Sequence, residues 1–153
     1  MHQQQSTTVL TVSEYSEALL AGIQNLLPQL TQRPADFTAD DLKTLIRSDH
    51  TELFIALHGD SGAQAIGMLT LVTFKTPTGY IARIEDVIVD TASRNKGIGI
   101  ALMNAAMEHA RNLQVTKMEL TSNGKRVAAN SLYRKLGFRM VDTNVFRMSL
   151  NAF

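Results

Sequence analysis

The chain contains no cysteine and no tryptophan, and only 3 of its 153 residues are proline. Without cysteine, the protein can form no disulfide, bind no metal through a thiolate and use no cysteine nucleophile. The sequence also lacks any run of about 18 apolar residues, so we expect no membrane-spanning helix. Its formal net charge is only +1, which gives the chain as a whole no attraction for nucleic acid.

Two further absences concern location and metal binding. Residues 1–8 are polar and lack the charged segment followed by an apolar segment that marks a secretory signal. We therefore expect a cytoplasmic protein. The four histidines show no spacing typical of metal ligands, so we expect no metal site.

What the sequence does contain is an ordinary globular composition. Hydrophobic residues make up 44% of the chain and charged residues 19%, which is enough for a substantial core. A chain of 153 residues has the usual size of one domain. We predict a single domain over residues 1–153, in which residues 1–7 are flexible.

The hydrophobic pattern predicts about seven strands and four helices in the order β-α-α-β-β-β-α-β-α-β-β. The predicted strands are 9–12, 52–58, 65–74, 80–89, 117–122, 139–142 and 145–150. The predicted helices begin at Ser13 or Ser16, after Thr38, at Gly97 and near Arg126, and Pro28 should stop or kink the first one. Strand–helix–strand units require parallel pairing, whereas the hairpin across residues 59–62 requires antiparallel pairing. We therefore predict an α/β (α+β) fold with a mixed, mostly antiparallel twisted sheet.

One stretch combines a strand, a polar loop and a helix that opens with glycines. The apolar strand end Val87–Val89 leads into the polar residues 90–96, and the helix follows from Gly97. The first N–H groups of a helix have no internal partner and lie at the positive end of its dipole. Arg94 and Lys96 add positive charge there, so the stretch is a candidate anion site. The alternative is an ordinary strand-to-helix turn that happens to contain two glycines.

Two motifs resemble those of a known family. Residues Arg94–Gly99, Arg-Asn-Lys-Gly-Ile-Gly, resemble the acetyl-CoA signature Arg/Gln-x-x-Gly-x-Gly/Ala of the GNAT superfamily of N-acetyltransferases. Downstream, Ala129–Phe138 reads Ala-Asn-Ser-Leu-Tyr-Arg-Lys-Leu-Gly-Phe, a second feature similar to the family. The resemblance implies a GNAT-type fold, in which the fourth and fifth strands splay apart and acetyl-CoA enters the gap. It also implies direct attack of a primary amine, which we expect to belong to a small molecule, on the thioester.

The resemblance assigns cofactor contacts to particular residues. The backbone of Arg94–Gly99 would hold the pyrophosphate, and the backbone of Val87 and Val89 would pair with the pantetheine arm like an added strand. A backbone N–H near Val87 is the expected donor to the oxyanion, and Asn130 would contact the pantetheine arm. The expected cofactor-binding residues are Val87, Ile88, Val89, Arg94, Asn95, Lys96, Gly97, Ile98, Gly99 and Asn130.

Two adjacent carboxylates are candidates for the general base. Glu85 and Asp86 should point to opposite faces of a strand. Members of the superfamily often place a glutamate on this strand that removes the proton directly or through water. We therefore name Glu85 first and Asp86 second, with a relayed water as the third option. The alternative for Glu85 is a surface ion pair with Arg83 or Arg139.

Tyr133 is the candidate general acid. Asn130, Tyr133 and Gly137 are spaced to share one helical face. By resemblance, the tyrosine lies near the cofactor sulfur. The reference tyrosine pKa of about 10 keeps the phenol protonated at neutral pH, as an acid requires. The alternative is a half-buried tyrosine whose hydroxyl reaches water.

Other functions stay open from the sequence. The acceptor would instead be a protein N-terminus or a lysine side chain if the acceptor site were an open peptide groove. A protein that binds acyl-CoA without turnover, as a sensor, is the rival outside the enzyme class. Homodimers are common in the superfamily, and Val145–Leu150 is a candidate contact strand for one.

Overall fold

The structure is a computed structural model that describes residues 7–59 and 64–150. Contacts divide the chain into two compact units, residues 1–121 and residues 122–153. The single domain predicted over residues 1–153 stays a prediction, and the flexibility predicted for residues 1–7 falls almost wholly outside the described residues. Within the described ranges, no helix is long and apolar enough to cross a membrane.

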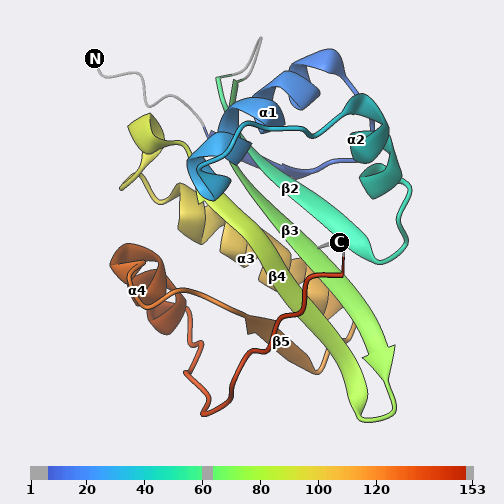
Figure 1. Ribbon diagram of the computed structural model, residues 1–153, viewed down its shortest axis with the longest axis vertical. Coiled ribbons are helices and arrows are strands. Elements are labelled where there is room, and N and C mark those ends of the chain that lie inside the picture. The colour runs from blue at the N-terminus through green and yellow to red at the C-terminus, as the bar shows by residue number, and fades with distance from the viewer. Residues whose placement is uncertain (1–6, 60–63, 151–153) are drawn as a thin grey trace. The chain divides into compact units, whose positions relative to one another are not determined.

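The first unit contains a five-stranded sheet in the order β1-β2-β3-β4-β5 (Figure 1). Its elements are β1 (Thr7–Thr11), α1 (Glu17–Thr31), α2 (Ala39–Ile46), β2 (Thr51–His58), β3 (Gln64–Thr76), β4 (Gly79–Val89), the 3-10 turn η1 (Thr91–Ser93), α3 (Ile98–Asn112) and β5 (Lys117–Leu120). Neighbouring strands are antiparallel except for β4 and β5, which are parallel. The predicted mixed, mostly antiparallel sheet is thus confirmed.

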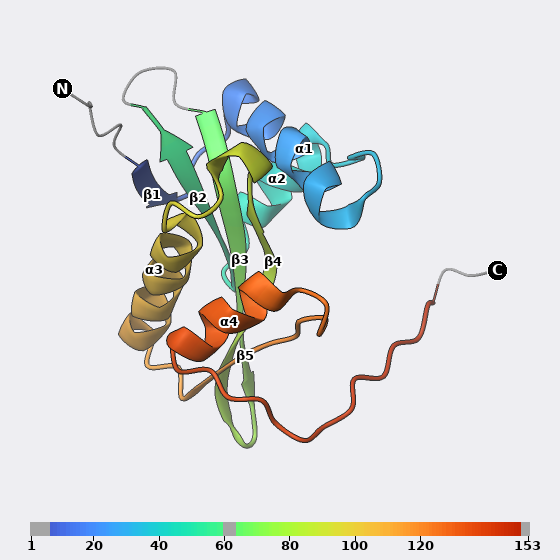
Figure 2. The same cartoon turned by 90° about the vertical axis from the view of Figure 1, so that its left-hand side faces the viewer.

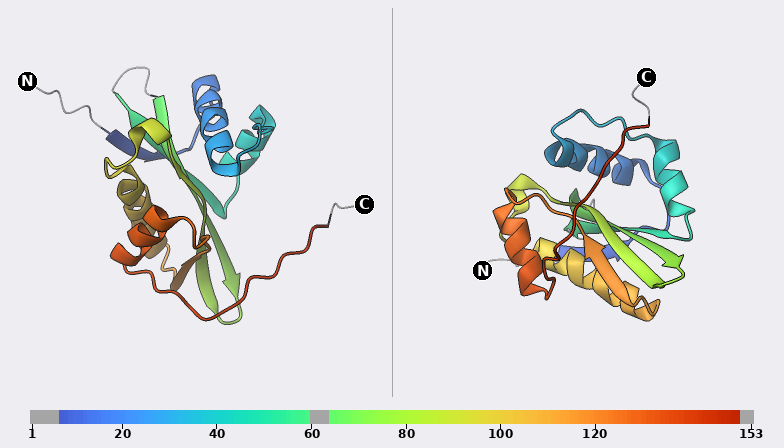
Figure 3. Two further views of the ribbon diagram at one scale, coloured as in Figure 1. Left: turned by 60° about the vertical axis from the view of Figure 1, so that its left-hand side comes forward. Right: turned by 60° about the horizontal axis from the view of Figure 1, so that its bottom comes forward.

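Helices cover both faces of this sheet. Helices α1 and α2 lie on one face and α3 lies on the other (Figures 2 and 3). The face below α1 and α2 is packed by a cluster of buried apolar side chains, among them Ile23, Leu26, Leu42, Leu53, Ile55, Met68 and Ile88. On the other face, α3 buries Ile98, Leu102, Met103, Ala106 and Ala110. Because both faces of the sheet are covered, β2 and β3 are buried on both sides, which explains why their sequences are continuous apolar runs.

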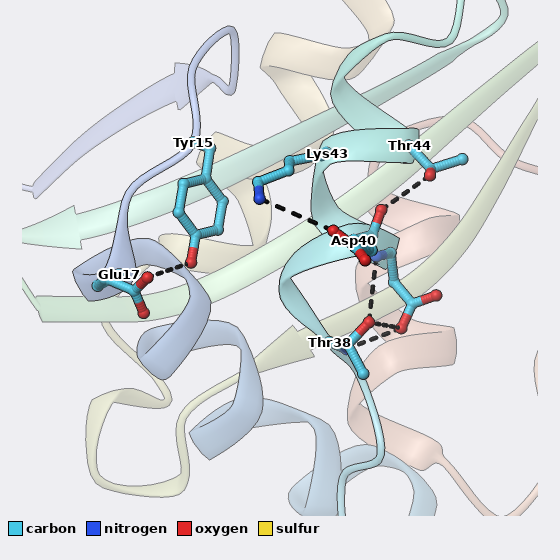
Figure 4. Close-up of polar contacts among 7 residues, drawn as sticks. Tyr15, Glu17, Thr38, Asp40, Lys43 and Thr44 are labelled. Carbon is cyan, nitrogen blue, oxygen red and sulfur yellow. Dashed lines mark hydrogen bonds and ion pairs between the residues drawn. The ribbon is translucent and has the colours of Figure 1, made fainter.

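Side chains cap the first two helices. The Ser16 hydroxyl accepts from the backbone N–H of Leu19 at the start of α1, so Ser16 rather than Ser13 is the cap. At α2, Thr38 and Asp41 each accept a hydrogen bond from the other's backbone N–H, at 3.2 and 2.8 Å. Figure 4 shows Thr38 at this helix start. These bonds satisfy N–H groups that would otherwise have no partner. Pro28 does not stop α1, which continues to Thr31.

Close packing of α1 on β3 depends on Gly22. A Cβ placed on Gly22 would lie 2.7 Å from the Cβ of Ala65, closer than side chains tolerate. We expect Gly22→Ala to lower the free energy of unfolding by about 1–3 kcal/mol, because the overpacking outweighs the gain of about 1 kcal/mol in helix propensity. Denaturant unfolding measures this change. The double variant Gly22→Ala/Ala65→Gly should recover most of the loss, and no recovery would contradict the assigned contact.

The second unit contains α4 (Val127–Lys135), and Gly137, just after the C-cap Leu136, adopts the left-handed conformation with φ 94°. The strands predicted at 139–142 and 145–150 are wrong, since no strand is present in residues 138–150. The apolar side chains of this segment are mostly exposed, from 64% at Val145 to 91% at Phe146. An alternating pattern predicts a strand only where a partner backbone is available. In the part of the chain that the structure describes, the sheet therefore has five strands rather than seven.

Candidate active site

Strand β4 carries a bulge at the carboxylates singled out from the sequence. Met68 of β3 lies opposite Ile88, but Thr70 lies opposite Glu85, so one residue of β3 faces two residues of β4. Asp86, inside the bulge, has φ 51° in the left-handed region. That conformation is uncommon for a residue other than glycine, although aspartate tolerates it better than most. A bulge of this kind bends the strand and redirects a side chain, as often occurs next to active sites.

The environment of Asp86 perturbs its acidity. Its side chain reaches the surface, yet the atoms around it remove part of the water that would solvate a carboxylate. This desolvation and, to a smaller extent, the negative charge of Glu85 raise the pKa of Asp86 above its ordinary value. A carboxylate with a raised pKa is a stronger base than a free one, as proton abstraction requires.

Glu85 is engaged in an ion pair within its own strand. Its Oε1 accepts a hydrogen bond from Nε of Arg83 at 2.5 Å, and both side chains are partly exposed. This is one of the two surface pairs that the sequence left open. A carboxylate held by an arginine has one oxygen already occupied. The geometry therefore favours Asp86 over Glu85 as the base, and the role of each stays a prediction.

The parallel pairing of β4 and β5 ends next to this bulge. Strand β5 pairs with β4 only from Ile81 to Ile84. Beyond Ile84, β5 does not cover the edge of β4, which runs on through residues 85–89 toward the loop. The splaying of the fourth and fifth strands that the resemblance implied stays a prediction, because β5 ends at Leu120, the partner of Ile84. An extended arm of a ligand can lie along such a strand edge.

The start of α3 differs from the starts of α1 and α2. Its N-cap is Gly97, with φ 77°, and no side chain caps this helix. The first intrahelical bond runs from the N–H of Ala101 to the carbonyl of Gly97, so the N–H groups of Ile98, Gly99 and Ile100 precede the helical ladder. A helix start without a side-chain cap leaves these donors and the positive end of the dipole available to an anion.

The loop before α3 is exposed and positively charged. Arg94, Asn95 and Lys96 are exposed, and Asn95 adopts φ 62° in the left-handed region. The Arg94 Nε donates to the carbonyl of Val89 at 3.3 Å, which keeps the guanidinium beside the end of β4. In residues 7–59 and 64–150, no acidic side chain pairs with Arg94 or Lys96. Both charges therefore remain for a ligand.

Gly67 of β3 lets α3 begin close to the sheet. A Cβ on Gly67 would lie 3.1 Å from Leu102, 3.2 Å from Ile98 and 3.2 Å from the carbonyl oxygen of Ile88. Ile98 is only 3% exposed, so the first residue of α3 is fixed against β3 and β4. This glycine was not singled out in the sequence, because the close approach joins residues far apart along the chain.

The second unit holds the remaining predicted site residues, Asn130 and Tyr133, on α4. Tyr133 is buried, and its ring lies edge-on to Phe138 with centroids 6.2 Å apart. Burial raises the pKa of Tyr133 above its ordinary value, and nearby Arg126 partly opposes this rise. The Asn130 amide donates to the carbonyl of Asn123 at 3.0 Å, which fixes the turn before α4. Its side-chain oxygen is the atom that would be left for a ligand.

The structure therefore gathers most of the predicted residues in one part of the first unit. Glu85 to Val89 lie on β4 at and beyond the bulge, and Arg94 to Gly99 form the loop and the start of α3. Among the described residues, no group of three or more histidine or acidic side chains is arranged to hold a metal.

Comparison with known proteins identifies the family. The profile of the Acetyltransferase (GNAT) family matches residues 20–138. Glucosamine 6-phosphate N-acetyltransferase 1 of Oryza sativa subsp. japonica is 29% identical over 140 residues, which cover 89% of this chain and 81% of the rice protein. N-acetyltransferase family 8 member 2 of Rattus norvegicus is 26% identical over 99 residues, or 60% of this chain. The match spans only 44% of the rat protein.

Solved structures share the fold. An aminoglycoside acetyltransferase, meta-AAC0020 from an uncultured soil metagenomic sample, in complex with sisomicin, superimposes with a TM-score of 0.82 at 17% identity, over 95% of this chain and 97% of that one. Aminoglycoside N-acetyltransferase AAC(6')-Iy in complex with CoA gives 0.77 at 17% identity, over 98% and 99% of the two chains. The family profile covers well over half of the sequence, and the protein is therefore a member of the Acetyltransferase (GNAT) family.

Proposed function

We propose that the protein transfers the acetyl group of acetyl-CoA to the primary amine of a small molecule. The observation that carries the proposal is the uncapped start of α3, with Arg94 and Lys96 before it, next to the edge of β4 that β5 leaves uncovered. The first feature suits a pyrophosphate, and the second suits the extended pantetheine arm. The structural neighbour AAC(6')-Iy, in complex with CoA, supports this choice of cofactor.

The chemistry assigns one role to each candidate residue. Asp86 takes the proton from the incoming ammonium, the amine nitrogen attacks the thioester carbonyl, and a tetrahedral oxyanion forms. The nitrogen of this intermediate still carries one proton more than the product amide. When the C–S bond breaks, Tyr133 gives its phenolic proton to the departing thiolate, the resulting phenolate takes the extra proton from the nitrogen, and Asp86 releases its own proton to water. Direct attack needs no covalent enzyme intermediate, in keeping with a chain that has no cysteine. Glu85, paired with Arg83, is the second candidate for the base.

Amino sugars are the first acceptors to test. The rice relative is named for glucosamine 6-phosphate, and the soil enzyme was solved with the aminoglycoside sisomicin. Both compounds carry a primary amine on a sugar scaffold. We propose this class as the starting point for the acceptor and keep peptides with a free N-terminus or a lysine as the comparison class.

Calorimetric titration with acetyl-CoA tests the cofactor, with ATP and NAD as controls. We expect selective binding of acetyl-CoA, followed by thiol release when amino sugars are added. If acetyl-CoA does not bind, the cofactor assignment is wrong. If it binds but no amine in a broad panel releases thiol, the protein is a sensor rather than a catalyst.

Substitution at Gly97 gives a sharper test of the phosphate site. A Cβ at Gly97 meets no protein atom within 4 Å, so it would project into the space that the pyrophosphate is proposed to occupy. We expect Gly97→Val to weaken acetyl-CoA binding by about tenfold or more, as measured by calorimetry. The valine should also strain the left-handed backbone at this position, which lowers the free energy of unfolding by about 1–2 kcal/mol.

Gly59 provides a matched control for this variant. It has φ 87°, and a Cβ there also meets nothing within 4 Å, but it lies at the end of β2 and outside the proposed site. Gly59→Val should carry a similar backbone strain and leave acetyl-CoA affinity unchanged. Equal loss of affinity in both variants would assign the effect to strain and not to a blocked phosphate.

A further inference from the structure

Gln29 of α1 forms hydrogen bonds with the loop that follows β4, about sixty positions later in the chain. Its Nε2 donates to Oδ1 of Asp90 at 2.9 Å. Its Oε1 accepts from the backbone N–H of Thr91 at 3.0 Å and from the Thr91 hydroxyl at 2.9 Å. Nε2 also donates to the carbonyl of Asn25 at 3.3 Å. Both donors and both acceptor positions of the amide are thus used.

The chemistry of the partners fixes the orientation of this amide. Nε2 faces a carboxylate and a carbonyl, which only accept, whereas Oε1 faces an N–H and a hydroxyl. A flipped amide would oppose donor to donor and acceptor to acceptor. Gln29 is also half-buried, so water replaces these bonds poorly if they are lost. The contact is therefore specific for a side chain with one donor end and one acceptor end.

Asp90 joins this contact to the rest of the sheet. Its backbone N–H donates to the carbonyl of Ile66 on β3 at 2.8 Å, and its Oδ2 accepts from the N–H of Ala92 at 3.1 Å. The segment that leaves β4 is thus held by α1, by β3 and by its own turn. Figure 2 shows this olive segment between β4 and α3 lying next to α1.

The loop from 90 to 98 is anchored at its two ends. Ile98, 3% exposed, fixes the far end against Gly67, and the contact with Gln29 fixes the near end. Between them, residues 94–97 are exposed. If the contact with Gln29 is lost, Thr91 loses its hydrogen bonds to α1, and the near end keeps only the bonds of Asp90 to β3 and to its own turn, so the path of the exposed residues is less tightly set. Ordering them again on binding costs conformational entropy.

We infer that Gln29 is a positioning residue for acetyl-CoA, because it holds Asp90 and Thr91 so that the loop Arg94–Gly99 is preset for the pyrophosphate. The inference rests on the proposed function of that loop. It assigns to α1, an element outside the signature motif, an indirect part in the affinity for the cofactor. Gln29 touches neither the cofactor nor the reacting atoms and acts only through the loop.

The test compares variants of two glutamines on the same helix. We expect Gln29→Ala to weaken acetyl-CoA binding by about tenfold, as judged from the loss of three hydrogen bonds to the loop. The near-isosteric Gln29→Glu should do the same, because its second oxygen would face the Asp90 carboxylate, and it serves if Gln29→Ala does not fold. Gln24→Ala is the control, since Gln24 donates from α1 to the carbonyl of Phe37 and has no hydrogen bond to the loop.

Three readouts separate positioning from general stability. The acetyl-CoA Kd and KM should rise in both Gln29 variants while kcat changes less. Amide hydrogen exchange over residues 91–100 should also quicken. Gln24→Ala should change neither affinity nor exchange in that segment. The inference is overturned if the Gln29 variants bind acetyl-CoA like the parent protein, or if Gln24→Ala weakens binding equally. Failure of the parent protein to bind acetyl-CoA would instead refute the proposed function.

Discussion

Replacing Asp86 with asparagine is expected to lower kcat by about 10²–10⁴-fold at neutral pH, the usual contribution of a general base. Acetyl-CoA affinity should be unchanged, because the loop and the start of α3 are untouched. The fold should also be retained, because asparagine tolerates a φ of 51° at least as well as aspartate. Steady-state kinetics, calorimetry and thermal unfolding measure the three quantities separately.

The pH dependence of this variant has a defined sign. The folded-state pKa of Asp86 is raised, so the protonated carboxyl favours folding at acidic pH, and this contribution is lost as the pH rises through the folded-state value. Asparagine is neutral, so the variant has no carboxylate charge for the surrounding atoms to desolvate. Its free energy of unfolding at neutral pH should therefore be no lower than that of the parent. In the parent, kcat/KM should rise with pH through a midpoint above that of an ordinary carboxyl. This acidic limb should disappear in Asp86→Asn.

Glu85→Gln is the matched comparison on the same strand. Glu85 is paired with Arg83, so its loss should cost little in kcat if the pair is structural. If Glu85→Gln abolishes the acidic limb and Asp86→Asn keeps it, the base is Glu85. If both variants keep the limb, a relayed water carries the proton and the proposal for Asp86 is wrong.

Tyr133→Phe should lower kcat by about 10²-fold, because general acid catalysis of thiolate departure is lost. The affinity for acetyl-CoA should change less than kcat. Because the pKa of Tyr133 is raised by burial, the phenol stays protonated at and above the pH where a free tyrosine ionises. The parent protein should therefore show no loss of activity on the alkaline side until the pH exceeds the ordinary tyrosine pKa of about 10.

Tyr80→Phe controls for the loss of a phenolic hydroxyl elsewhere. Tyr80 lies at the beginning of β4, and its hydroxyl contacts Thr73 at 3.4 Å, away from the bulge. Its removal should leave kcat nearly unchanged. A Tyr133→Phe variant as active as Tyr80→Phe would remove Tyr133 from the acid role.

Local sequence signals predicted most of the fold. The first nine elements, from β1 to α4, occur in the predicted order, because each has its own apolar period or glycine signal. The segment 145–150 has the alternating pattern of a strand, but pairing depends on a partner that no local pattern reveals. Phe146, Met148 and Leu150 keep the alternating apolar pattern, but their side chains are exposed and the segment forms no strand.

The sequence motif of the site could be predicted, but the backbone conformation and the contacts of its residues could not. The signature Arg94–Gly99 indicated a phosphate loop, and the loop does lead into an uncapped helix. The choice between Glu85 and Asp86 assumed a regular pleat, which the bulge interrupts. An aspartate in the left-handed conformation leaves no glycine to mark that bulge in the sequence. Gln29 was missed because its partners lie about sixty positions away, and nothing near it in the sequence indicates them.

The contrast between the starts of the helices has a consequence for the lifetime of the protein. Helices α1 and α2 are capped by side chains, whereas α3 has no side-chain cap, and in the proposed function a ligand completes it. A ligand that binds only the folded chain adds stability with its concentration, about 2.7 kcal/mol at a hundred times Kd. If that ligand is acetyl-CoA, the fraction of molecules open to proteases falls as the supply of acetyl groups rises. The abundance of the protein would then follow the metabolic state of the cell without any dedicated regulator.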